Sequence, residues 1–163
     1  MGWARAQLGR TAEGVSLIRQ ALAGLVERGA RVGITDVLTR LAESQDLDGA
    51  TDDALSTIED ALNENPKELI FRPNTIKCRG DLRLKLGQTE LAEADFREAI
   101  AMAQRMGAKA WELRAAISLA RILQARRDPD AARDLLAPLY HWFTEGFGTA
   151  DLKDAKSLLD ELG

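Results

Sequence analysis

Apolar residues recur along the chain in one arrangement that is repeated four times. Each copy opens with a short polar break and continues with apolar residues at i, i+4, i+7 and i+8, which lie on one face of an α-helix. The large anchors of the four copies are Ile18, Ile58, Phe96 and Leu136, so the copies are spaced by 40, 38 and 40 positions. A second apolar stripe precedes the later breaks. Each period therefore predicts two helices joined by a tight turn.

The breaks contain residues that are typical of helix ends. Gly9, Gly49 and Gly87 each follow the first helix of a pair, where a residue with left-handed backbone geometry often ends a helix. Arg127 takes this place in the fourth copy, and Asp128-Pro129 is expected to cap the helix that follows. Arg72-Pro73 is expected to open the first helix of the third pair, in the same way.

The pattern predicts a single domain over residues 1–163. Its helix pairs are expected near 1–28, 30–64, 67–106 and 108–143, separated by Gly29, Asn65-Pro66 and Gly107 and followed by a capping helix at 150–162. The opening helix is short, so the chain holds about 3.5 pairs. The composition agrees, because 26 Ala and 24 Leu stand against only 12 Val plus Ile. Ala and Leu favour helices, whereas strands favour β-branched residues, so the fold class is expected to be all-α.

The repeated positions resemble the tetratricopeptide repeat (TPR). That family has a small residue, a Gly, an Ala, a large apolar residue and a second Ala in each repeat. The third copy matches with Gly80, Gly87, Ala92, Phe96 and Ala99, and the second with Ala42, Gly49, Ala54, Ile58 and Ala61. The fourth copy departs at Arg127 and Leu139, and the period exceeds the usual 34 or so residues. The resemblance implies a right-handed superhelix of antiparallel pairs, with Phe96 buried against its partner helix near Gly80.

The resemblance also implies a concave groove lined by the first helix of each pair. The residues expected to face this groove are Asp36, Thr39, Glu43, Asn74, Lys77, Asp81, Arg114, Ile117 and Arg121. They run from acidic to basic, which would suit a protein or peptide partner of matching polarity. Lys77 matches the two-carboxylate clamp of some members of the family, but Asp81 does not. The alternatives are solvated charges without a ligand, or an effector-sensing groove that binds a small molecule.

A narrower resemblance concerns the parent protein. Gly2-Trp3-Ala4, the run 8–11 and the stretches 109–121 and 132–152 are similar to the repeat region that ends large bacterial regulators. Those proteins carry a nucleotide cyclase-like or DNA-binding module and a signalling ATPase before the repeats. The resemblance implies that this chain is a regulatory tail, cytoplasmic and bacterial, which acts in signal transduction through protein–protein interaction.

No catalytic constellation is found in the sequence. There is no phosphate-binding loop and no dinucleotide fingerprint, so neither an enzyme nor a cofactor is expected. One Cys and one His make a zinc site improbable. Cys78 is expected to be a small buried residue of the core, and His141 a partly buried packing or capping residue near a helix end. The net charge of −4 argues against nucleic acid, and no apolar run reaches the roughly 20 residues that span a membrane.

The N-terminal end is expected to mediate self-association. The opening helix lacks a preceding pair, and it presents Trp3 and Leu8 where an end repeat needs a polar face. A second copy could cover these residues across a two-fold axis, giving a homodimer.

Overall fold

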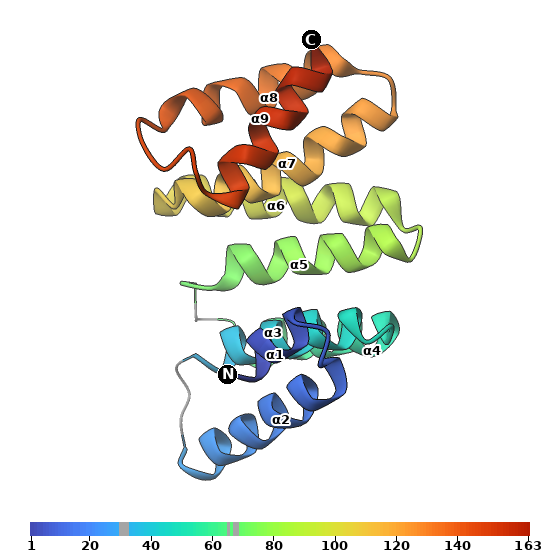
Figure 1. Cartoon of the computed structure of the whole chain (residues 1–163), viewed down its shortest axis with the longest axis vertical. Coiled ribbons are helices and arrows are strands. Elements are labelled where there is room, and N and C mark those ends of the chain that lie inside the picture. The colour runs from blue at the N-terminus through green and yellow to red at the C-terminus, as the bar shows by residue number, and fades with distance from the viewer. Residues whose placement is uncertain (30–32, 65, 67–68) are drawn as a thin grey trace.

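The computed structural model describes residues 1–29, 33–64, 66 and 69–163. These residues form nine α-helices and no strand (Figure 1). The all-α prediction is confirmed. The helices are α1 (Gly2–Gln7), α2 (Thr11–Glu27), α3 (Ile34–Leu47), α4 (Thr51–Glu64), α5 (Arg72–Lys85), α6 (Thr89–Met106), α7 (Lys109–Ala125), α8 (Pro129–Trp142) and α9 (Ala150–Leu162).

The helices form two rows. Consecutive helices pack as pairs, α1 with α2 and so on to α7 with α8, and each pair stacks on the next. The odd-numbered helices also contact one another from α1 through to α9, whereas the even-numbered helices do not contact each other within the described residues. A stack of helices curves toward the side on which its successive helices lie closer together. The row α1, α3, α5, α7 and α9 therefore forms the inner, concave face.

The helix ends follow the sequence prediction. Gly9, Gly49 and Gly87 have φ angles of 83°, 86° and 76°, and Arg127 takes the same left-handed geometry at 63°. The Asp128 side chain accepts a hydrogen bond from the Ala131 backbone N–H and caps α8, as predicted. The predicted break at Asn65-Pro66 and the predicted pair starts at 30 and 67 involve residues that lie outside the described ones.

Small residues allow the two helices of a pair to touch. Ala42 and Ala54 are fully buried in the second pair, as are Ala120 and Ala132 in the fourth. In the third pair a Cβ on Gly80 would lie only 2.5 Å from Cε1 of Phe96, which is itself fully buried. The predicted contact between Gly80 and Phe96 is confirmed.

The first pair contains a crossing of the same kind that the sequence analysis missed. A Cβ on Gly14 would lie 2.7 Å from the Gly2 carbonyl oxygen, and one on Gly2 would lie 2.8 Å from Cγ1 of Ile18. Gly2 stands 40 positions before Ala42, so the repeat spacing could have identified it.

The hydrophobic core has two parts. One continuous cluster extends from Ala42 in α3 to Leu162 in α9. A second, smaller cluster of Val15, Ile18 and Leu41 joins α2 to α3. The first pair is therefore attached to the rest of the stack through a small apolar contact, with polar contacts around it.

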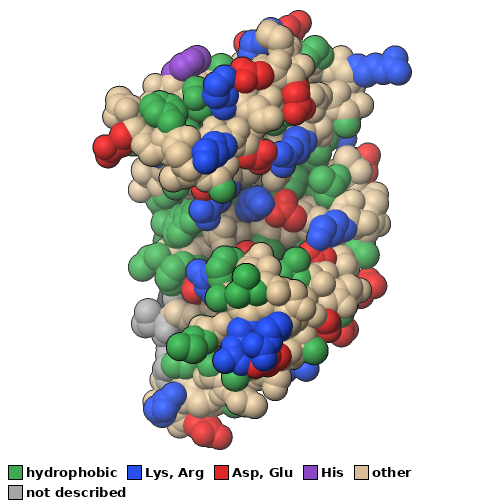
Figure 2. All heavy atoms as spheres, in the orientation of Figure 1, with side chains coloured by type: hydrophobic (Ala, Val, Ile, Leu, Met, Phe, Trp, Pro, Cys, Tyr) green, Lys and Arg blue, Asp and Glu red, His purple; other side chains and the backbone are tan. Residues whose placement is uncertain are grey.

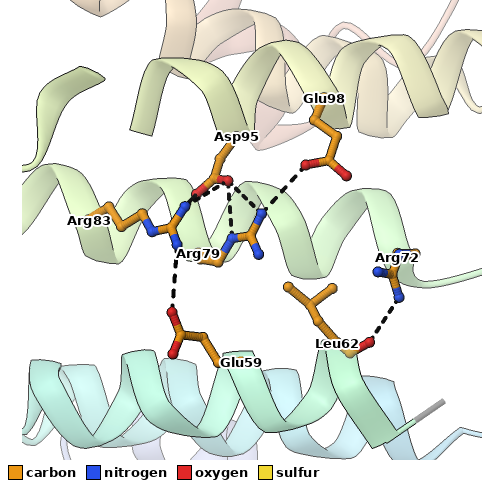
Figure 3. Close-up of polar contacts among 7 residues, drawn as sticks. All are labelled: Glu59, Leu62, Arg72, Arg79, Arg83, Asp95 and Glu98. Carbon is orange, nitrogen blue, oxygen red and sulfur yellow. Dashed lines mark hydrogen bonds and ion pairs between the residues drawn. The ribbon is translucent and has the colours of Figure 1, made fainter. Parts of the chain in front are cut away.

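Arginines of α5 link the second and third pairs, and a buried carboxylate holds two of them (Figure 3). Asp95 in α6 accepts hydrogen bonds from Arg79 (2.6 Å to Nη2) and Arg83 (2.9 Å to Nη1), both in α5. Arg83 also pairs with Glu59 of α4 at 3.5 Å, and Arg72 donates to the Leu62 carbonyl oxygen at the end of α4. Since α4 and α6 make no direct contact, these arginines connect them through α5.

The Gly80–Phe96 contact predicts a coupled pair of mutations. Phe96→Ala should lower the free energy of unfolding by about 3–5 kcal/mol, because it empties a fully buried site. Gly80→Ala should destabilise the wild type by about 1–3 kcal/mol, because its Cβ collides with the Phe96 ring. In the Phe96→Ala background, Gly80→Ala should lower the free energy of unfolding by much less, because the ring that its Cβ would meet is absent. Urea denaturation of the four proteins measures this coupling, and additive effects would show that the two residues do not touch.

The Asp95 cluster predicts a large loss of stability from one carboxylate. Asp95→Ala leaves Arg79 and Arg83 partly buried without their shared partner and should cost about 3 kcal/mol. Glu98→Ala is the control, since Glu98 is half exposed and only touches Arg79 at 3.5 Å, and it should cost under about 1 kcal/mol. Thermal denaturation followed by circular dichroism distinguishes the two, and equal effects would contradict the assignment.

Candidate functional groove

A hollow of about 430 Å³ opens on the concave face between α1, α3 and α5. Its floor is apolar and its rim is charged, with residues from three successive helices of the inner row. Figure 2 shows charged residues of both signs interspersed with hydrophobic ones, so no single sign of charge dominates this view. The residues that line the hollow are Trp3, Gln7, Glu43, Asp46, Leu47, Cys78, Asp81, Leu82, Leu84 and Lys85.

Trp3 lies in this hollow and not on the open outer end where it was expected. Its indole N–H donates a 2.6 Å hydrogen bond to Oε2 of Glu43, and the Arg40 guanidinium lies 5.0 Å from its ring centroid. The repeat spacing explains the orientation, because Trp3 stands 40 positions before Glu43, which was itself expected to face the groove. Leu8 is 80% exposed, and self-association through this end stays a prediction.

Glu43 is half-buried beside Trp3. Burial raises the pKa of Glu43, and the hydrogen bond from Trp3 and the charges of Arg40 and Lys77 only partly offset it. No described cation lies within ion-pair distance of its carboxylate.

The other carboxylates of the hollow have partners. Asp81 pairs with Lys77 at 2.6 Å and accepts a 3.2 Å hydrogen bond from the Ser118 hydroxyl of α7. Asp46 pairs with Lys85 of α5. Polar contacts thus join α1 to α3, α3 to α5 and α5 to α7 along the inner row.

The basic residues of the predicted groove form ion pairs with α9. Arg114 pairs with Asp151 at 2.7 Å, and Arg121 pairs with Asp154. The predicted change from acidic to basic along the groove is therefore wrong as a description of the accessible surface, because α9 supplies the opposing charge. Both aspartates lie near the start of α9.

Two of the predicted groove residues are buried between helices. Thr39 is 1% exposed and its hydroxyl lies 2.9 Å from that of Thr75, and Ile117 is 4% exposed. Both were expected to face a ligand, and that expectation is wrong, since adjacent inner helices pack directly on them. Asp36 and Asn74 are half-buried at the edge of the face, and Asp36 pairs with Arg40 at 3.0 Å.

The groove offers little reactive chemistry. Burial raises the pKa of the Cys78 thiol well above its ordinary value, so the thiol stays protonated and unreactive. His141 lies in the last turn of α8, near a helix end as expected, but it is exposed and not partly buried. In the described part of the chain, no group of three or more His, Cys, Asp or Glu side chains could hold a metal ion. None of the helices described is both long and apolar enough to cross a bilayer.

The comparisons with known proteins show the fold. No known protein family and no curated protein matches the sequence. Among solved structures, the nearly identical TPR-like repeats of a proposed kinesin light chain from Podosopora anserina superpose with a TM-score of 0.76 at 16% identity, over 99% of this chain and 81% of that one. BtubC (BKLC) from P. vanneervenii superposes with a TM-score of 0.75 at 20% identity, over 97% and 74%. The chain therefore has a TPR-like repeat fold.

The environment of Glu43 predicts a pH-dependent effect of one substitution. The native state holds the Glu43 proton more tightly than the unfolded chain does, because burial raises the pKa from about 4.5. The protonated Glu43 side chain therefore stabilises the native state. This stabilisation is fully present below about pH 4.5 and is lost as the pH rises through the raised pKa of Glu43 in the native state. Glu43→Gln keeps an acceptor for Trp3 and removes the charge, so its melting temperature should exceed that of the wild type at pH 7.

The control for this measurement is Glu145→Gln, which removes the same charge from an exposed site between α8 and α9. Glu145→Gln should leave the melting temperature nearly unchanged at pH 7 and also below pH 4.5. The gain from Glu43→Gln should shrink below pH 4.5, and a variant that is less stable than the wild type at pH 7 would contradict the assignment.

Proposed function

We propose that the protein is a non-catalytic scaffold that binds a segment of a partner protein on its concave face. The observation that carries this proposal is the hollow between α1, α3 and α5, which is lined by three successive inner helices and has apolar surface from α3 and α5. A TPR-like fold provides such a face, and its neighbours among solved structures are repeat proteins of this kind.

The composition of the hollow favours a peptide that is partly apolar. Leu47 and Leu84 are 47% and 36% exposed, so the hollow offers a guest accessible apolar surface. The charged residues Asp46, Asp81 and Lys85 lie beside them. Apolar side chains of a guest could therefore reach the floor while its backbone and polar groups meet the rim.

The parent protein is a separate part of the proposal. The stretches 109–121 and 132–152 resemble the repeat region that ends bacterial cyclase-like and ATPase regulators, so we place this domain as the cytoplasmic regulatory tail of such a protein. Genomic sequence upstream of this chain tests the assignment. A cyclase-like or ATPase module in the same reading frame supports it, and an unrelated frame contradicts it.

A small-molecule effector is the second candidate for the groove. The volume of about 430 Å³ lies within the range of small-molecule pockets, and the floor is apolar. The hollow is open to solvent along its rim, which favours a peptide over a ligand that would need to be enclosed.

Selection from a random peptide library displayed on phage tests the scaffold function. We expect enriched peptides whose binding is lost by at least about tenfold in Leu47→Arg, because this substitution fills the hollow with a long charged side chain. Leu91→Arg is the matched control, since Leu91 is 51% exposed on α6 and does not line the hollow.

Comparison of Leu47→Arg with Leu91→Arg shows whether the enriched peptides bind in the hollow. Peptides that bind the wild type and Leu91→Arg equally, but not Leu47→Arg, support the groove. Enriched peptides that bind all three proteins equally would contradict it, as would a selection that enriches none.

A further inference from the structure

One carboxylate of the hollow has no ion-pair partner among the residues that the structure describes. Asp46 pairs with Lys85, Asp81 pairs with Lys77, and Asp36 at the edge of the face pairs with Arg40. For Glu43, the described residues supply only the indole N–H of Trp3. Its environment nevertheless desolvates it, and a half-buried charge without a counter-charge is costly.

The geometry around Glu43 keeps one of its oxygens available. Trp3 donates to Oε2, which holds the carboxylate in a fixed orientation on the wall of the hollow. Arg40, a cation beside this wall, donates from Nε to Asp36 at 3.0 Å and lies over the Trp3 ring. Its guanidinium is therefore already engaged and does not form an ion pair with Glu43.

The surroundings of this carboxylate suit a long side chain with a charged end. Leu47, Leu82, Leu84 and Cys78 supply apolar surface in the same hollow. The aliphatic stems of Lys and Arg pack well on such surface while their charged ends reach a carboxylate.

We propose that the Trp3–Glu43 wall of the hollow binds a Lys or Arg side chain of the partner segment, and that the adjacent apolar floor takes a neighbouring apolar side chain. The proposal rests on the proposed scaffold function and names the chemical class of its ligand. A guest cation supplies the counter-charge that the protein itself does not provide to Glu43. An acidic segment would instead bring a further negative charge beside Glu43, Asp46 and Asp81.

Three tripeptides that differ in one side chain test this site. The acetylated and amidated peptides Leu-Arg-Leu, Leu-citrulline-Leu and Leu-Glu-Leu are titrated into the 15N-labelled full chain, and the Trp3 indole N–H signal is followed. The chain has three Trp residues, and Trp3→Phe identifies the signal. We expect Leu-Arg-Leu to bind about tenfold more tightly than its neutral citrulline isostere, as for a charge-assisted hydrogen bond, and Leu-Glu-Leu to bind most weakly.

Glu43→Gln should remove this preference, so that the arginine and citrulline peptides bind alike, whereas Glu145→Gln should preserve it. Glu43→Gln is expected to fold, because it retains the acceptor for Trp3. Equal binding of all three peptides to the wild type would overturn the cation site and leave the groove in place. A preference that survives Glu43→Gln would overturn it too. Peptides that move no signal of the hollow, together with a failed library selection, would overturn both proposals.

Discussion

The close approach of the two helices within each pair is the constraint on which the rest of the structure depends. Where they cross, the side chains are reduced to Gly or Ala, as at Gly80 against Phe96 and at Gly2 against Gly14. A Cβ at either glycine of the first pair would meet backbone atoms of the facing helix, which cannot move aside without separating the helices. The residues at these crossings and the larger apolar residues around them form one continuous core from α3 to α9.

The sequence predicted these short-range features because each depends on residues within one repeat. The turn glycines, the left-handed Arg127 and the Asp128 cap depend on local backbone chemistry alone. The burial of Phe96 follows from a pattern that repeats at a fixed spacing.

The groove was predicted less well, because its surface depends on contacts between repeats. Register places Thr39 and Ile117 on the inner face of their helices, but it does not say how closely the next inner helix approaches, and both residues are buried. The ion pair between Arg114 and Asp151 joins residues that are 37 positions apart, and no local sequence pattern predicts it. Trp3 was misplaced for another reason. The short opening helix was interpreted as an exposed end, although its spacing from Glu43 already placed it on the inner face.

The contacts along the inner row also determine what the groove can recognise. Charges that are paired within the protein, such as Lys77 with Asp81, offer a guest only an exchange of one ion pair for another, and exposed pairs of this kind contribute little. Specific recognition then depends on exposed apolar surface and on charges without a counter-charge. In the described part of this hollow those are the exposed edge of the apolar floor and the carboxylate of Glu43, whose one hydrogen bond comes from the neutral Trp3.

The position of the hollow connects recognition with stability. The first pair has its own small apolar cluster, and it is joined to the main core through Leu41 and through polar contacts such as that of Trp3 with Glu43. A segment with few apolar contacts separates from the rest at a lower free energy than the main core does. The hollow is lined by α1 on one side and by α5 on the other, so a bound segment touches both the first pair and the main core. A partner segment that bound there as proposed would need both the first pair and the main core in place, so its binding free energy would add to the attachment of the first pair. The same Trp3–Glu43 contact therefore holds the end of the stack and forms one wall of the hollow.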